Sequence, residues 1–378
     1  MIQLNFPNAV TDEKDFYGRR AELERISEVL LSNQRLPVVI MGERRIGKTS
    51  LQNIAVQRLR AAEPGYIPVF VEPRGITSLD EFAEAIFQRL CTHLKKGLQE
   101  TGLLGEDARL HLETPSQFKT AFLQLQGPAS RETILLCVDE FEEIIRKADL
   151  ETGGRESARI DALTHALVEE TDLPVRLLFT MTRLPESVQK SYPTPLTHFS
   201  EIIELRPFTP GEMNEMLLGI TQEALIFSAP EKHWLFGMSG GHPYFAKLLL
   251  ANLVERQKPS KLPAVVDQAM LALALQAAIQ DPRANHVLEN IYKVHFSDHE
   301  KRVMLWLAER GRPVAAAEFK AAGLPLLTAA RTLVRRDYLV EQEGRFEFQI
   351  KLLGRWLQNW IEFEEELERF DIWQSSFI

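Results

Sequence analysis

One short stretch has the composition of a loop that holds phosphate groups. Residues 42–49 read Gly-Glu-Arg-Arg-Ile-Gly-Lys-Thr, which fits the pattern G-x-x-x-x-G-K-[ST]. The two glycines let the backbone curl until successive N–H groups face phosphate oxygens, and the following helix adds its N-terminal dipole. Lys48 would reach the β- and γ-phosphates, and the Thr49 hydroxyl would hold Mg²⁺. The predicted nucleotide contacts are Gly42, Glu43, Arg44, Arg45, Ile46, Gly47, Lys48, Thr49 and Ser50.

Two acidic residues farther along the chain could supply hydrolytic chemistry. Asp139 and Glu140 directly follow the apolar run 134–138. A buried strand that ends in acidic residues presents them at the edge of a sheet, beside the phosphate loop. There Asp139 would order the water shell of Mg²⁺, and Glu140 would act as general base on the attacking water. Together with the loop, this pair predicts hydrolysis of the bound nucleotide.

The elements that must position these residues have the pattern of an α/β domain over residues 1–207. Short apolar runs alternate there with amphipathic helical patterns, and the runs are residues 38–41, 67–71, 134–138, 176–181 and 202–205. Nearly continuous apolar character is typical of parallel strands that are covered on both faces. Strands alternating with helices therefore predict a doubly wound parallel sheet.

Two further units are predicted after this α/β core. Residues 208–293 have helical patterns without a strand signal, which predicts a helical lid. In residues 294–378 we expect three helices, a hairpin and a long final helix, at residues 297–309, 315–322, 325–336, 338–349 and 356–370. Three helices followed by a hairpin are typical of a winged-helix domain.

Two stretches resemble parts of the STAND-type signal-transduction ATPases, which belong to the AAA+ superfamily. Residues 16–23, with Gly18 and Arg19, resemble the stretch that these proteins place against adenine. Residues 240–243, Gly-Gly-His-Pro, resemble the element of the lid whose proline packs on the same base. The resemblance thus implies that Gly18, Arg19 and Pro243 bind the adenine of ATP or ADP.

Two more stretches carry the same resemblance. Residues 42–51 are similar to the loop of the prokaryotic, archaeal ATPase-like members, and residues 177–183 are similar to a strand that ends in a Thr-x-Arg sensor. The resemblance implies that Arg183 contacts the γ-phosphate, and that the five strands form a sheet in the order 5-1-4-3-2. One departure is that residues 348–355 contain no histidine, where the family has its switch histidine.

Composition narrows the classes of function. The formal net charge of −9 argues against a protein that coats nucleic acid over its whole surface. Cys91 and Cys137 stand in apolar segments, as expected for free thiols in a reducing compartment.

No signal peptide is evident, and the apolar stretch 270–279 is too short to span a membrane. We therefore expect a cytoplasmic protein without a membrane partner. His295 and His299 lack a third ligand at metal spacing, so no zinc site is expected there.

The sequence leaves three uses of the nucleotide open. In the first, the nucleotide state controls conformation, and the ATP state binds a protein partner or self-associates. In the second, the winged helix binds DNA through Arg331, Arg335 and Arg336, as in origin-recognition or transposition-type AAA+ proteins. In the third, the chain is a scaffold that binds nucleotide without turnover. Glu140 separates the third use from the first two, because a scaffold needs no general base.

Overall fold

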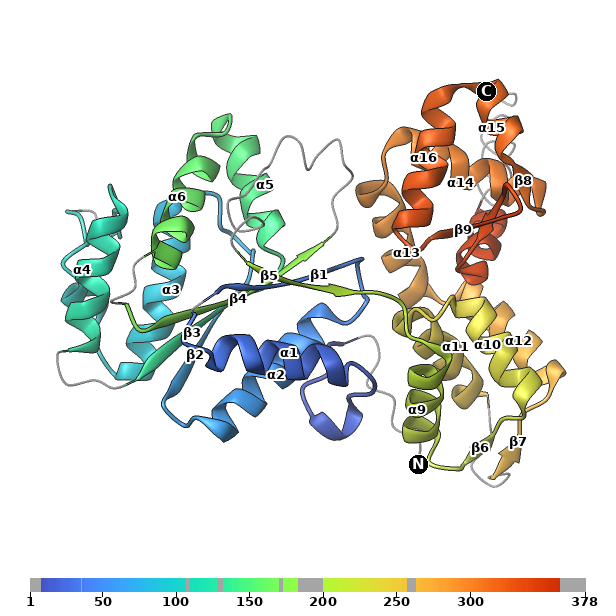
Figure 1. Cartoon of the computed structure of the whole chain (residues 1–378), viewed down its shortest axis with the longest axis horizontal. Helices are drawn as coiled ribbons and strands as arrows, with labels where there is room; N and C mark the ends of the chain where they lie inside the picture. Colours follow the sequence, from blue (N-terminus) through green and yellow to red (C-terminus); the bar gives the residue numbers. More distant parts are fainter. Residues whose placement is uncertain are drawn as a thin grey trace, which may run out of the picture.

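The computed structural model describes residues 8–34, 36–106, 109–127, 132–169, 173–182, 200–256 and 263–360. Figure 1 shows an α/β core with two further units beside it, one above the other on the same side of the sheet. Arg183, which the resemblance assigns to the γ-phosphate, lies outside the described residues. In the described part of the chain, no helix combines the length and the apolar character needed to cross a membrane.

The core is built on a five-stranded parallel sheet, as predicted. Its strands are β1 (Val38–Gly42), β2 (Tyr66–Val71), β3 (Thr133–Val138), β4 (Val175–Thr182) and β5 (Glu201–Leu205). They lie in the order β2-β3-β4-β1-β5, which is the predicted order 5-1-4-3-2 counted from the opposite edge. Because all four pairings are parallel, the carboxyl ends of β1, β3 and β4 meet at one edge of the sheet. The loops that follow these three strands therefore come together.

Helices cover both faces of this sheet. On one face lie α1 (Arg20–Leu31) and α2 (Lys48–Ala62); on the other lie α3 (Leu79–Leu94), α5 (Phe141–Thr152) and α6 (Arg155–Glu169), with α4 (Pro115–Gln126) outside them (Figure 1). Alternate strand side chains enter the two apolar clusters, as the twofold periodicity of a strand requires. Cys91 and Cys137 are both buried and unbonded to each other, as expected.

Among the described residues, five helices follow the sheet and form the helical unit. They are α9 (Pro210–Thr221), α10 (Ala229–Ser239), α11 (Pro243–Glu255), α12 (Gln268–Gln280) and α13 (Pro282–His295). The prediction that this region lacks strands was wrong, because β6 (Leu225–Ile226) pairs in parallel with β7 (Ala264–Val265). Strands of two residues are too short for any periodicity to reveal.

The C-terminal unit contains the predicted three helices and hairpin. Its elements are α14 (Asp298–Arg310), β8 (Val314–Ala315), α15 (Ala316–Ala322), α16 (Leu324–Arg335), β9 (Leu339–Gln342) and β10 (Arg345–Phe348), followed by a helix over residues 351–360. The three strands form an antiparallel sheet in the order β8-β10-β9. The final helix was predicted to begin at residue 356 but begins five residues earlier, and its predicted continuation beyond residue 360 lies outside the described residues.

A single apolar cluster joins the helical and C-terminal units. It contains side chains of the helical unit such as Phe245 and Leu249, and side chains of the C-terminal unit such as Val303 and Leu353. Two different clusters fill the α/β core. Because interiors packed in this way resist shear, the two units should move together relative to the core.

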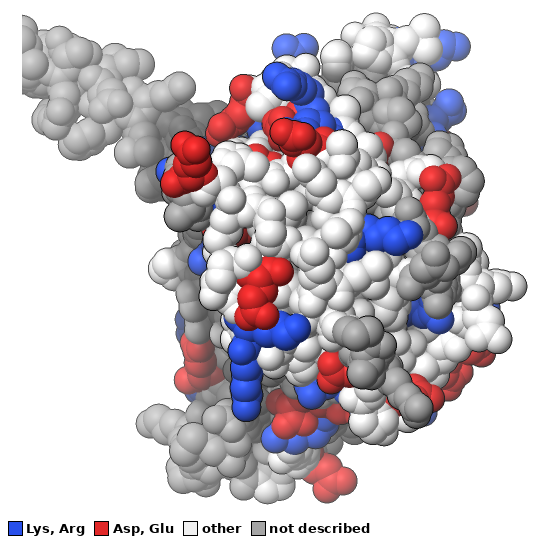
Figure 2. All heavy atoms as spheres, turned by 90° about the vertical axis from the view of Figure 1, so that its left-hand side faces the viewer, with Lys and Arg blue, Asp and Glu red and all other residues white. Residues whose placement is uncertain are grey.

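Charge is mixed on the face of the core near α4. Figure 2 shows Lys and Arg side chains scattered among Asp and Glu on this face, with broad uncharged surface between them. The described part of this face therefore presents no continuous basic track for a nucleic-acid backbone, in agreement with the net charge of −9.

Candidate nucleotide site

The predicted phosphate loop joins β1 to α2 at the carboxyl edge of the sheet. β1 ends at Gly42 and α2 begins at Lys48, with Gly47 at its N-cap in the left-handed region at φ 106°. A Cβ atom on Gly42 would lie 2.9 Å from both Ile46 and the carbonyl oxygen of Leu205, so only glycine fits there. The loop lines a cavity of about 520 Å³.

Lys48 is buried inside its own loop. Its ammonium group donates to the carbonyl oxygens of Gly42 and Glu43, at 3.1 Å each, and to the Thr182 hydroxyl at 3.2 Å. Burial lowers the pKa of Lys48, and nearby carboxylates, led by Glu142, oppose that shift. The lysine thus ties the end of β1 to the end of β4 at the place where a phosphate chain would enter.

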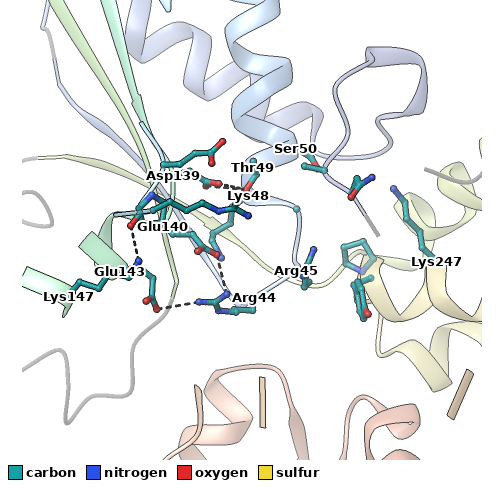
Figure 3. Close-up of a pocket in the computed structure, with 18 residues that line it drawn as sticks. Arg44, Arg45, Lys48, Thr49, Ser50, Asp139, Glu140, Glu143, Lys147 and Lys247 are labelled. Atoms are coloured by element: carbon teal, nitrogen blue, oxygen red, sulfur yellow. Dashed lines mark hydrogen bonds and ion pairs between the residues drawn. The ribbon is translucent and has the colours of Figure 1, made fainter. Parts of the chain in front are cut away.

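Thr49 and Asp139 lie side by side, as predicted. The Thr49 hydroxyl is 3.0 and 3.1 Å from the two carboxylate oxygens of Asp139, across the cavity wall formed by α2 and β3 (Figure 3). Hydroxyl and carboxylate oxygens are the ligands that Mg²⁺ prefers in proteins. This oxygen pair therefore fits the ion that the sequence predicts.

Thr180, which the sequence did not single out, positions both acidic residues. Its buried hydroxyl donates to a carboxylate oxygen of Asp139 and accepts the backbone N–H of Glu140 at 2.9 Å. Glu140 has a left-handed backbone at φ 46°, which is unusual for a residue other than glycine. A polar residue in the middle of a mostly apolar strand was the signal that could have identified Thr180.

Arg44 connects the loop to Glu140. Its guanidinium lies 3.3 Å from a carboxylate oxygen of Glu140 and 3.3 Å from one of Glu143 (Figure 3). In this arrangement the predicted general base is ion-paired to the predicted phosphate-binding residue. A phosphate group that attracted Arg44 would therefore release Glu140.

A smaller apolar cavity adjoins the loop on the side of α1. Its aromatic and aliphatic lining is provided by Val10, Phe16, Tyr17, Ile46, Phe208 and Met216. Arg19 and Pro243, both predicted base contacts, also line this cavity. The sequence did not predict Phe208 or Met216, which belong to the helical unit and the segment before it.

Gly18 has a different neighbour from the one predicted. A Cβ atom there would lie 3.0 Å from the carboxylate of Glu212 in α9, so Gly18 allows the core to pack on the helical unit. The neighbouring Arg19 donates to the carbonyl oxygen of Arg206, and its guanidinium lies 4.7 Å from the centre of the Phe208 ring. Among the described residues, Gly18 does not line either cavity.

The helical unit also contacts the loop. Nε2 of His242 lies 3.2 Å from the carbonyl oxygen of Arg44, and burial lowers the pKa of His242 to about 3, so the ring is neutral. The guanidinium of Arg45 lies 5.9 Å from the centre of the Tyr244 ring. Both contacts come from the segment that includes Pro243.

Arg336 corrects one prediction. It was assigned to DNA, but its side chain is 4% exposed and forms a bidentate ion pair with Glu43 of the phosphate loop, at 3.0 Å for each contact. It also donates to Glu300 and to the carbonyl oxygen of His295, both at 3.1 Å. Burial opposes the charge of Arg336, but Glu43 and Glu300 raise its pKa. Arg336 points inward because it follows the last turn of α16, whereas Arg331 and Arg335 are exposed.

A family comparison identifies the protein class. The sequence profile of an ATPase domain found predominantly in Archaea matches residues 16–249, which include the loop, the acidic pair and the start of α11. The chain belongs to this family. It is an ATPase, and ATP hydrolysis is its activity. No curated protein matches its sequence.

Two solved structures resemble this ATPase over nearly their whole length. A Walker-type ATPase of Pyrococcus abyssi is 15% identical with a TM-score of 0.63, and the alignment covers 93% of this chain and 98% of that one. The ORC2 protein of Aeropyrum pernix, solved in ADPNP–ADP complexes, is 15% identical with a TM-score of 0.59, covering 95% and 100%. At this identity, the likeness concerns the fold.

Glu142 gives the ATPase a buried carboxylate next to Lys48. The side chain is 6% exposed, and burial raises its pKa to about 7, while Lys48 and Thr182 act in the opposite direction. An unfolded chain would bind this proton only near the ordinary glutamate pKa. Between these two pH values the folded state holds a proton that the unfolded state has lost, so rising pH favours unfolding.

Replacing Glu142 by glutamine should therefore change how stability depends on pH. We compare the free energy of unfolding of E142Q with that of the wild type. The difference in favour of E142Q should grow by about 3 kcal/mol from pH 4.5 to pH 8, because glutamine has no proton that the folded state must retain or lose. Urea unfolding at a series of pH values measures the difference. His242 and His295, whose pKa values burial lowers to about 3, titrate in both proteins and cancel. A stability difference between E142Q and the wild type that stays constant from pH 4.5 to pH 8 would contradict the raised pKa of Glu142.

Proposed function

We propose that this ATPase is a nucleotide-dependent conformational switch of the STAND type, in which the helical unit is the lid and the C-terminal unit is a winged helix. The observation that carries the proposal is the buried ion pair between Glu43 of the phosphate loop and Arg336 of the C-terminal unit. The pair joins a residue of the predicted nucleotide site directly to a turn that lies 293 positions away in the sequence.

The loop is held from several sides. Arg336 binds the Glu43 side chain, His242 contacts the Arg44 carbonyl oxygen, and Tyr244 lies beside the Arg45 guanidinium. A phosphate chain that drew the loop around itself would alter all three contacts. Because the helical and C-terminal units share one apolar cluster, a shift at the loop would move them as one body.

Several residues have roles in the proposed hydrolytic step. The loop N–H groups and Lys48 bind the phosphates, while Thr49 and Asp139 hold Mg²⁺, which neutralises phosphate charge when bound. Arg44 turns from Glu140 to the phosphates, and Glu140 then takes a proton from the attacking water. By the family resemblance, Arg183 contacts the γ-phosphate.

The output of the switch is proposed to be association. The ATP state would expose a surface for a protein partner or for a second copy of the chain, and hydrolysis would close it. Two buried free thiols suit a reducing compartment, and we propose the cytoplasm.

Hydrogen exchange tests the coupling directly. We expect a non-hydrolysable ATP analogue and ADP to give different amide exchange at residues 336–340, which follow α16, as well as at the loop itself. The reason is that Arg336 connects this turn to Glu43. Exchange that differs between the two nucleotides only in the loop and the two cavities would contradict the proposal.

A second candidate function rests on the exposed arginines of α16. Arg331 and Arg335 lie one helical turn apart and face solvent, and Arg345 is exposed on the adjacent hairpin. This arrangement favours contact with DNA phosphates. The candidate predicts duplex binding that weakens steeply with salt and is reduced in R331A/R335A. Absence of binding at low salt would exclude it.

A further inference from the structure

A lysine of the helical unit faces the nucleotide site. Lys247 lies in the second turn of α11 and lines both the 520 Å³ cavity and the smaller apolar cavity. Figure 3 shows its side chain extending from that helix toward the part of the pocket where Ser50 lies. Gly47, Ser50 and Pro243 also line both cavities. Lys247 therefore stands at their junction.

The charge of Lys247 has little compensation from the protein. Within the described ranges, no carboxylate lies at ion-pair distance from its ammonium group, and Asp15 acts on it only from farther away. Burial lowers the pKa of Lys247, an effect that Asp15 offsets in part. Because a half-buried cation that has no ion-pair partner loses part of its hydration, this position is suited to an anion that enters from solution.

The chemistry of the two cavities indicates which anion this is. The apolar cavity, with Tyr17, Phe208 and Met216, suits a flat base, whereas the larger cavity, with Lys48 and Thr49, suits the outer phosphates. In a nucleotide, the ribose and the α-phosphate lie between the base and the outer phosphates. Only the α-phosphate carries a charge that could pair with Lys247.

We propose that Lys247 binds the α-phosphate of the nucleotide and so attaches the helical unit to it in both the ADP and the ATP state. The inference rests on the proposed switch and deepens it. The helical unit would hold a group that ADP and ATP share, and the γ-phosphate would then act through the loop and its contact with Arg336. Hydrolysis would change the C-terminal contact without releasing the base from the helical unit.

Calorimetric titration of K247M with four ligands tests this assignment. We expect the Kd values for ADP, AMP and a non-hydrolysable ATP analogue to rise about tenfold to a hundredfold, as loss of a charge-assisted contact predicts. The Kd for adenosine should stay within about twofold of the wild type, because adenosine has no phosphate. K247R should recover most of the affinity. The matched control is K232M, on α10 and outside both cavities.

Three results would overturn the assignment. Equal weakening of adenosine would mean that Lys247 supports the base site or the fold; weakening of the ATP analogue alone would place it at the γ-phosphate; unchanged affinities would remove it from the site. A different result would contradict the proposed switch, namely identical conformations with ADP and with the ATP analogue. That result would not change the effect of K247M on the Kd values, so the two proposals can fail separately.

Discussion

Replacing Glu140 by glutamine should slow ATP hydrolysis by about two to four orders of magnitude while leaving ATP binding intact, because a general base contributes roughly that factor. Glutamine keeps the size of the side chain but cannot accept the proton of the attacking water. Phosphate release at saturating ATP measures the rate, and equilibrium titration with a non-hydrolysable analogue measures binding.

Glu143 supplies the matched control for this experiment. Glu143 also pairs with Arg44, at the same distance of 3.3 Å as Glu140 does. It lies one helical turn after the acidic pair Asp139 and Glu140. E143Q should therefore lose less than about tenfold in rate. Equal rates for E140Q and the wild type would show that Glu140 is not the general base. They would favour the alternative in which the chain is a scaffold that binds nucleotide without turnover.

Replacing Arg336 by methionine should destabilise the folded chain by about 3–5 kcal/mol, because it leaves buried carboxylates without their counter-charge. Glu43 and Glu300 are 4% and 1% exposed, so water cannot replace the guanidinium. Urea unfolding measures the loss. R335M, one position earlier on the exposed face, should stay within about 0.5 kcal/mol of the wild type.

A second substitution separates the ion pair from simple loss of packing. In the R336M background, changing Glu43 to glutamine removes one stranded charge and should restore about half of the lost stability. If E43Q and R336M add without coupling, the Glu43–Arg336 pair does not stabilise the interface, and the link between the loop and the C-terminal unit would have to be sought elsewhere.

Features encoded by local pattern were predictable from the sequence. The five strands are nearly continuous apolar runs, and the loop at Gly42 and the acidic pair at Asp139 are short motifs whose spacing is set by backbone geometry. The strand order came from the family resemblance, and the structure confirms it. Apolar runs of this length and glycines at these positions are compatible with few local structures other than buried parallel strands and tight turns.

Contacts between distant segments were not predictable. Arg335 and Arg336 are adjacent in the sequence. Which of them is buried depends on how the end of α16 packs against the phosphate loop. Thr180 acquires its role because β4 lies beside β3. Lys247 was within reach of sequence reasoning, since it stands four residues after Pro243 and so shares its face of α11.

Energy transfer between the core and the C-terminal unit tests the proposed switch most directly. Dyes attached through E63C and K320C label exposed positions of the two parts, and the native Cys91 and Cys137 are buried. We predict different transfer efficiencies with ADP and with a non-hydrolysable ATP analogue, and no such difference in E43Q/R336Q, whose nucleotide binding is measured in parallel. Identical efficiencies in the two nucleotide states of the otherwise wild-type chain would contradict the proposed switch.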